Sequence, residues 1–257
     1  MSTASVRVAV ASERPASRSS SRDDVRVEGP AYILVHSPVV GPTTWRPVAD
    51  VLEAQGRRAT IPSLQGVEDS TPPHWRWCAD RLVEAIGAEA GPVVLIGHSG
   101  AGPLLPIVGT EISGDVRSYV FVDATIPERM GSTPIVPAEL LEPLEALAVD
   151  GRVPKWSRWW DDEEAMRGLV PDDAIRERLE EELPSLPLTY FREAVPVPEG
   201  WPDAACGYLL FSAACEPVAR EAESRGWPTR HLPGEHLHMV VDPEAVAGAI
   251  VDLAEQG

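Results

Sequence analysis

Apolar residues along this chain fall into short runs that alternate with segments of helical spacing. The runs that predict strands cover residues 31–35, 58–62, 93–96, 119–122 and 208–212. Apolar residues three and four apart predict helices at 45–52, 75–88 and 103–108, and a closing helix starts at Pro243 with Asp242 as its cap. This alternation predicts an α/β fold, in which helices cover both faces of a mostly parallel sheet.

The alternation fails in two places. Residues 1–29 hold a strand-like pattern at 6–10, where an edge strand is expected, followed by a polar stretch at 13–24 that we expect to be loosely ordered. Residues 127–202 read as several short helices broken by prolines. We therefore expect a core made of residues 30–126 and 203–257, with 127–202 as an insert.

The predicted strand at 93–96 runs directly into Gly97-His98-Ser99-Gly100-Ala101-Gly102. Small residues on both sides of Ser99 permit a sharp turn between a strand and a helix, where larger side chains would collide. A serine on such a turn presents its hydroxyl beyond the end of the sheet. Ser99 is therefore the candidate nucleophile.

This motif resembles the Gly-x-Ser-x-Gly nucleophile elbow of the α/β-hydrolase family, with Ser99 at the nucleophile position. Ala101 stands where the family has its last glycine, which is a small departure. The resemblance implies an acid and a histidine further along the chain. It also implies that a helical insert such as 127–202 forms a lid over the site.

The resemblance places the catalytic base on the loop before the last helix. His236 fits best, because the family's usual proline at the helix start lies seven residues past the histidine, as Pro243 does here. His238, two residues further on, is the alternative. We expect only one of the two to reach Ser99.

The resemblance places the acid after the penultimate strand, where Glu216 follows the run at 208–212. A carboxylate there would accept the imidazole N–H of the base and fix its tautomer. Asp123, at the end of the strand at 119–122, is the second candidate, because some family members use that position. We favour Glu216.

The opposite wall of the expected site departs from the family. Its members commonly have His-Gly-x here, where x and the residue after the nucleophile donate backbone N–H groups to the oxyanion. This chain reads His36-Ser37-Pro38-Val39, so His36, Ser37 and Val39 are candidates for this wall, and x is Pro38, which has no N–H. Gly100 can supply one donor. Either Val39 or a side chain such as Ser37 supplies the other, or the reaction does not depend on a full oxyanion hole.

Aromatic residues gather in the insert. Three of the chain's eight tryptophans, Trp156, Trp159 and Trp160, fall within five residues. We expect them to line an apolar substrate pocket. The alternative is that they pack the insert against the sheet.

The net charge of the chain limits the classes of molecule that it is expected to bind. The chain has 257 residues and a net charge of -18, from 22 Lys and Arg against 40 Asp and Glu. Nucleic acids and anionic membranes need a basic surface, so we expect neither as a partner, and we expect a small-molecule substrate. No apolar run is long enough for a signal peptide or a membrane span.

The number and spacing of the cysteines indicate the cellular compartment and whether a metal site is expected. Cys78, Cys206 and Cys215 show neither metal-binding nor disulfide spacing, which fits a reducing cytoplasm. We expect a cytoplasmic protein with no metal and no organic cofactor.

These residues lead to three hypotheses. The first is a serine hydrolase of a small to medium apolar ester, lactone or thioester, with Ser99 as nucleophile, His236 as base and Glu216 orienting it. The second keeps the fold and uses the Ser–His pair for proton abstraction or elimination, as lyases and biosynthetic enzymes of the family do. Pro38 favours it. The third is a non-catalytic ligand-binding protein. The presence of a serine, a histidine and an acid at fitting positions argues against it.

Overall fold

The computed structural model describes residues 29–87, 91–160 and 164–256. The strand expected at 6–10 and the polar stretch at 13–24 lie outside the described residues. None of the described helices is both long and apolar enough to cross a membrane.

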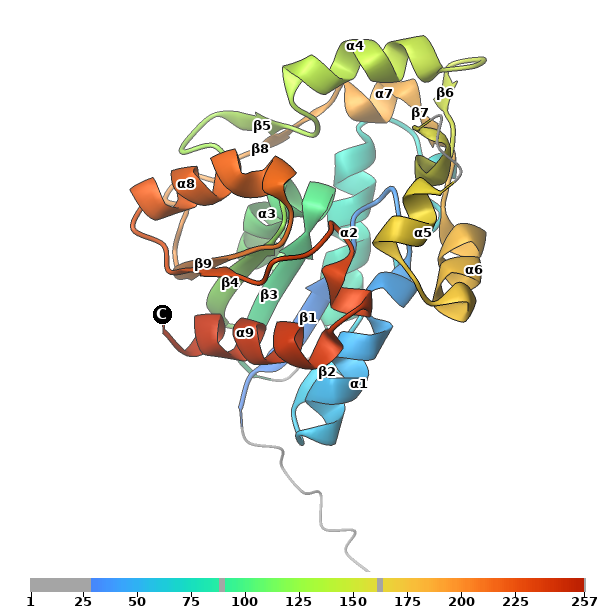
Figure 1. Ribbon diagram of the computed structural model, residues 1–257. Coiled ribbons are helices and arrows are strands. Elements are labelled where there is room, and N and C mark those ends of the chain that lie inside the picture. Colours follow the sequence, from blue (N-terminus) through green and yellow to red (C-terminus); the bar gives the residue numbers. More distant parts are fainter. Residues whose placement is uncertain (1–28, 88–90, 161–163, 257) are drawn as a thin grey trace, which may run out of the picture.

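A six-stranded parallel sheet forms the centre of the fold, as the sequence predicts (Figure 1). Its strand order is β10-β9-β4-β3-β1-β2. The strands are β1 (Ala31–Val35), β2 (Arg58–Thr60), β3 (Val93–His98), β4 (Val116–Val122), β9 (Ala205–Leu210) and β10 (Thr229–His231). The edge strand β10 was not predicted, because its three residues are half-buried or exposed and carry no apolar pattern.

Helices cover both faces of the sheet, so the predicted fold class is confirmed. One face packs against α1 (Arg46–Ala54) and α9 (Pro243–Glu255), and the other against α2 (His74–Ile86), α3 (Leu105–Glu111) and α8 (Glu216–Ser224). Successive residues of β1 serve opposite faces: Ile33 joins the core under α2 and α3, and Leu34 joins the core under α1 and α9. The predicted cap is also present, since the Asp242 side chain accepts a hydrogen bond from the Ala245 N–H.

The insert lies between β4 and β9 and stands beyond the carboxyl ends of the central strands (Figure 1). Besides helices, it contains two short antiparallel pairs, β5 with β8 and β6 with β7, which the sequence did not predict. Its elements are β5 (Ser132–Pro134), α4 (Ala138–Leu147), β6 (Arg152–Val153), α5 (Ala165–Leu169), α6 (Asp173–Glu182), β7 (Leu186–Pro187), α7 (Leu188–Phe191) and β8 (Ala194–Pro196). That the insert acts as a lid stays a prediction.

Candidate active site

Ser99 lies on the sharp turn between β3 and a short 3₁₀ helix, Ser99–Leu104, that leads into α3. Its φ of 55° is in the left-handed region, which a serine rarely adopts, so surrounding packing must hold it there. A methyl group added to Gly102 would lie 1.9 Å from the Thr125 carbonyl oxygen, so only glycine fits at 102. Ala101, the departure from the family motif, is fully buried, and its methyl group is part of the core.

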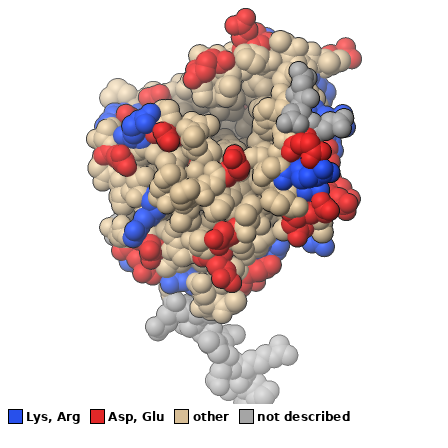
Figure 2. All heavy atoms as spheres, viewed as in Figure 1, with Lys and Arg blue, Asp and Glu red and all other residues tan. Residues whose placement is uncertain are grey.

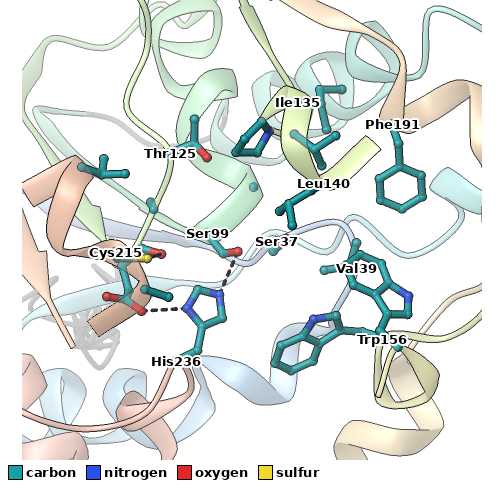
Figure 3. A pocket seen from close by; sticks show the side chains of 18 of the residues that line it. Ser37, Val39, Ser99, Thr125, Ile135, Leu140, Trp156, Phe191, Cys215 and His236 are labelled. Atoms are coloured by element: carbon teal, nitrogen blue, oxygen red, sulfur yellow. Dashed lines mark hydrogen bonds and ion pairs between the residues drawn. The ribbon is translucent and has the colours of Figure 1, made fainter. Parts of the chain in front are cut away.

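A chain of hydrogen bonds joins Ser99 to a histidine and an aspartate (Figure 3). His236 Nε2 lies 2.9 Å from Ser99 Oγ, and His236 Nδ1 lies 2.7 Å from Asp123 Oδ2. The Asp123 side chain is fully buried, whereas the His236 side chain is 25% exposed. In this arrangement the histidine can accept the serine proton while the carboxylate fixes its tautomer.

Asp123 follows β4 with a φ of 45°, and the neighbouring strand supports its carboxylate. Oδ1 accepts the N–H groups of Phe211 (2.9 Å) and Ser212 (3.1 Å), and Oδ2 accepts the Ser212 hydroxyl at 2.6 Å. Burial alone raises the pKa of Asp123, but the hydrogen bond and charge of His236, with the bonds from Ser212 and Phe211, lower it to about 2. The carboxylate is therefore charged at neutral pH.

The preference for Glu216 as the acid is wrong in this structure. Glu216 begins α8, and its side chain is 51% exposed and lies 3.5 Å from Arg220. The segment after β9 instead contributes the N–H groups that hold Asp123, because β4 and β9 are adjacent in the sheet. The alternative candidate, Asp123, therefore lies beside His236.

The two candidate histidines face different ways. His236 reaches Ser99, whereas His238 begins a 3₁₀ turn and packs edge-on against the Phe211 ring, with the ring centres 5.5 Å apart. The structure therefore brings the preferred histidine to the site and leaves His238 outside it.

His98 is the residue before Ser99, and the elbow motif predicts no role for it. Its Nε2–H donates to the backbone carbonyl of His236 at 3.0 Å, which links the elbow to the histidine loop. Burial and the neighbouring His236 lower the pKa of His98 to about 3, so its ring is neutral. Only a tertiary contact could identify this positioning role.

The loop after β1 forms the opposite wall. Ser37 and Val39 line the pocket with Gly100. His36, also a candidate for this wall, is fully buried and does not line the pocket; burial lowers its pKa to about 4. Because His36 Nε2 accepts the Leu64 N–H at 3.1 Å, its proton is on Nδ1, which donates to the Ser37 carbonyl at 2.8 Å. His36 thus supports the loop.

An apolar pocket of about 290 Å³ opens beside Ser99. Figure 2 shows this face hollowed, with mostly neutral side chains around the hollow and carboxylates spread over the surrounding surface. The insert supplies much of the lining: Ile135, Val136, Pro137, Leu140, Trp156, Trp159, Tyr190 and Phe191.

A second hollow of about 500 Å³ also borders His236. It shares Trp156, Ala214, Cys215 and His236 with the first pocket, but it does not include Ser99. Trp160 lines this second hollow and not the first. The three tryptophans expected to line one pocket are therefore divided between two.

One group of side chains in the described part of the chain has the composition of a metal site. Ligand atoms of Asp123, Cys215 and His236 lie within 4.8 Å of one another. Two of these groups already hydrogen-bond each other, and the Cys215 thiol donates to the Asp123 carbonyl oxygen at 3.5 Å. Burial raises the pKa of Cys215 to about 12, so the thiol is protonated at neutral pH.

Solved structures similar to this one are α/β-hydrolases. An extracellular alpha/beta-hydrolase from a Paenibacillus species, described as homologous to tobacco salicylic acid binding protein 2, is 17% identical; the match covers 88% of this chain and 99% of that one, with a TM-score of 0.71. Polyneuridine aldehyde esterase is 16% identical; the match covers 88% of this chain and 100% of the esterase, with a TM-score of 0.64. A pyrethroid hydrolase from Sphingobium faniae JZ-2 is 21% identical (88% and 97% covered, TM-score 0.61).

At these identities the structural neighbours establish the fold, and they include esterases and other hydrolases. Comparison with curated proteins gives no match. The sequence pattern of the Alpha/beta hydrolase family matches residues 32–249, a range that includes the elbow, the aspartate after β4 and the histidine loop. The chain therefore belongs to the α/β-hydrolase family.

Proposed function

We propose that this protein is a serine hydrolase that cleaves a small to medium apolar carboxylic ester, lactone or thioester through an acyl-enzyme. The observation that carries the proposal is the continuous hydrogen-bonded chain from Ser99 through His236 to Asp123, which ends at an apolar pocket. Activity as a hydrolase agrees with the family and with the esterases among the structural neighbours.

Acylation uses all three side chains. Ser99 Oγ attacks the carbonyl carbon while its proton passes to His236 Nε2, 2.9 Å away. The charged Asp123 stabilises the resulting imidazolium through Nδ1. When the tetrahedral intermediate collapses, the bond to the leaving oxygen or sulfur breaks, and that atom takes the proton from Nε2. Water then repeats the sequence on the acyl-enzyme and releases the acid.

The pocket indicates a neutral, apolar acyl group. No Lys or Arg is among the described residues that line it, so a second carboxylate on the substrate would have no partner there. The net charge of -18 also repels anions at long range. The aromatic and aliphatic lining stabilises apolar groups by removing them from water.

The two hollows suggest separate places for the two halves of the substrate. The leaving group must receive its proton from His236, and the second hollow adjoins His236 without reaching Ser99. The acyl group then occupies the pocket beside Ser99 and Gly100. On this assignment Trp159→Ala changes acyl-chain preference, and Trp160→Ala changes preference for the alcohol.

A fluorophosphonate probe and a series of p-nitrophenyl esters test the proposal. We expect labelling of Ser99, shown by peptide mapping, and faster hydrolysis of butyrate and octanoate than of palmitate. Ser99→Ala should remove both labelling and hydrolysis. It should remain folded, because the turn already accommodates small residues. If that variant kept most of the wild-type rate, nucleophilic catalysis by Ser99 would be ruled out.

Pro38 favours a second candidate function. Without an N–H at this position, the backbone donor set for a tetrahedral oxyanion is incomplete. The Ser–His pair could instead abstract a proton for an elimination or lyase reaction with no acyl-enzyme. Protein that is folded, resists fluorophosphonate labelling and does not hydrolyse esters would support this alternative.

A further inference from the structure

The proposed reaction places negative charge on the substrate's carbonyl oxygen, and that oxygen needs hydrogen-bond donors. Gly100, the residue after Ser99, lines the pocket and presents one backbone N–H to this oxygen, as the residue after the nucleophile does in this fold. The loop after β1 forms the other wall, where Pro38 has no N–H. A different group must complete the pair of donors.

Ser37 places a hydroxyl at this wall. A methyl group added to Gly100 would lie 3.1 Å from Ser37 Oγ, so the hydroxyl packs directly against the residue that follows Ser99. Ser37 and Ser99 both line the pocket, and Figure 3 labels them next to each other. The hydroxyl therefore borders the space that a carbonyl oxygen enters when Ser99 attacks.

This hydroxyl has a free hydrogen-bonding capacity. Ser37 is only 2% exposed, and within residues 29–87, 91–160 and 164–256 no group hydrogen-bonds to its Oγ. Ser37 Oγ is not among the side-chain atoms of the described residues that are both fully buried and without a partner, so the hydroxyl opens into the pocket and can donate to a ligand there. The pocket that Ser37 lines is where such a ligand binds.

The backbone of Ser37 is fixed from both sides. Its carbonyl accepts hydrogen bonds from His36 Nδ1 at 2.8 Å and from the Val40 N–H at 3.0 Å, and His36 is itself anchored by the Leu64 N–H. The ring of Pro38 also fixes the φ angle of residue 38, directly after Ser37. Donors held in place before the reaction stabilise a transition state without the cost of reorganising them.

We propose that the Ser37 hydroxyl donates a hydrogen bond to the oxyanion and, with the Gly100 N–H, forms the oxyanion hole. This inference rests on the proposed function. No proton is transferred in the step: the Ser37 O–H stays intact and shortens its contact with the oxygen as charge develops there. The N–H of Val39, which also lines the pocket, is the competing donor.

Four proteins test the assignment: wild type, Ser37→Ala, Ser37→Thr and the double variant Ser37→Ala/Pro38→Ala. For Ser37→Ala we expect kcat for p-nitrophenyl butyrate to fall about 10²-fold or more, with KM little changed, because the bond forms mainly in the transition state. Ser37→Thr keeps the hydroxyl and should keep most of kcat. The double variant introduces an N–H at position 38 and should recover at least about tenfold over Ser37→Ala.

Affinity for an alkyl boronic acid, which forms a tetrahedral adduct on a serine, supplies a second readout. Ser37→Ala should weaken boronate binding by a factor similar to its loss in kcat, while its thermal unfolding temperature stays near that of the wild type. If Ser37→Ala kept kcat within threefold of the wild type while Ser99→Ala was inactive, the donor would be another group such as Val39, and our assignment would be overturned. If the wild type formed no acyl-enzyme at Ser99, the proposed function would fail and this inference with it.

Discussion

Replacing Asp123 with Asn should stop catalysis without disturbing the fold. Asn tolerates the left-handed φ of 45° at this position. Its side-chain oxygen can still accept the N–H groups of Phe211 and Ser212, which now bond to Oδ1. Its NH₂ group would replace Oδ2, which faces His236 Nδ1 at 2.7 Å. The variant thus exchanges an acceptor for a donor at one atom.

That exchange reverses the tautomer of His236. With a donor opposite Nδ1, the ring proton moves to Nε2, which then points its N–H at Ser99 and cannot accept the serine proton. Acid-to-amide changes in other Ser-His-Asp enzymes lower kcat about 10⁴-fold, equivalent to about 5.5 kcal/mol of activation free energy. Losing the charge also affects stability. Because His236, Ser212 and Phe211 hold the pKa of the Asp123 carboxyl below its ordinary 3.8, the charged carboxylate stabilises the folded chain at neutral pH, and the amide loses that contribution.

The assay is kcat for p-nitrophenyl butyrate, with circular dichroism and urea unfolding as checks on folding. Glu216→Gln is the matched control: it makes the same chemical change at an exposed carboxylate that pairs with Arg220, and we expect activity within twofold of the wild type. A folded Asp123→Asn variant that kept more than a tenth of the wild-type kcat would refute the reasoning. So would a large loss in Glu216→Gln.

Three further predictions concern other parts of the site and fold. His238→Ala should keep most of the esterase activity, whereas His236→Ala should lose about as much as Ser99→Ala, because a triad acts as a unit; the opposite pattern in a kcat assay would contradict the geometry. Gly102→Ala should fail to fold or should unfold at a much lower temperature in calorimetry, since its methyl group would lie 1.9 Å from a backbone oxygen. The free energy of unfolding should fall as the pH drops from 6.5 towards 4. In the unfolded chain His36 takes up a proton at its ordinary pKa of 6.5, whereas in the folded chain burial lowers its pKa to about 4. This residue alone should therefore lower the free energy of unfolding by about 2 kcal/mol at pH 5, which urea titrations measure. A stability that stays flat over this range would show that His36 is already protonated in the folded protein or is not buried.

Elements that depend only on neighbouring residues could be predicted from the sequence. The run at 31–35 matches β1 residue for residue, because a strand covered on both faces must be apolar throughout. The cap at Asp242 with Pro243 after it marks the start of α9, and the glycine-rich turn marks the elbow. In each case the physical requirement acts within a few neighbouring residues, so the local pattern carries it.

The partners of these features depended on the tertiary structure. His236 meets Ser99 across 137 residues and Asp123 across 113, and no local pattern ranks Asp123 above Glu216. The strand order determines which carboxylate pairs with His236. Because β4 lies beside β9, the residues after β9 supply the N–H groups that hold a buried carboxylate after β4. A buried charge is stable only where such donors converge. That convergence is a property of the assembled sheet, whereas the sequence by itself determined the elbow and the histidine loop.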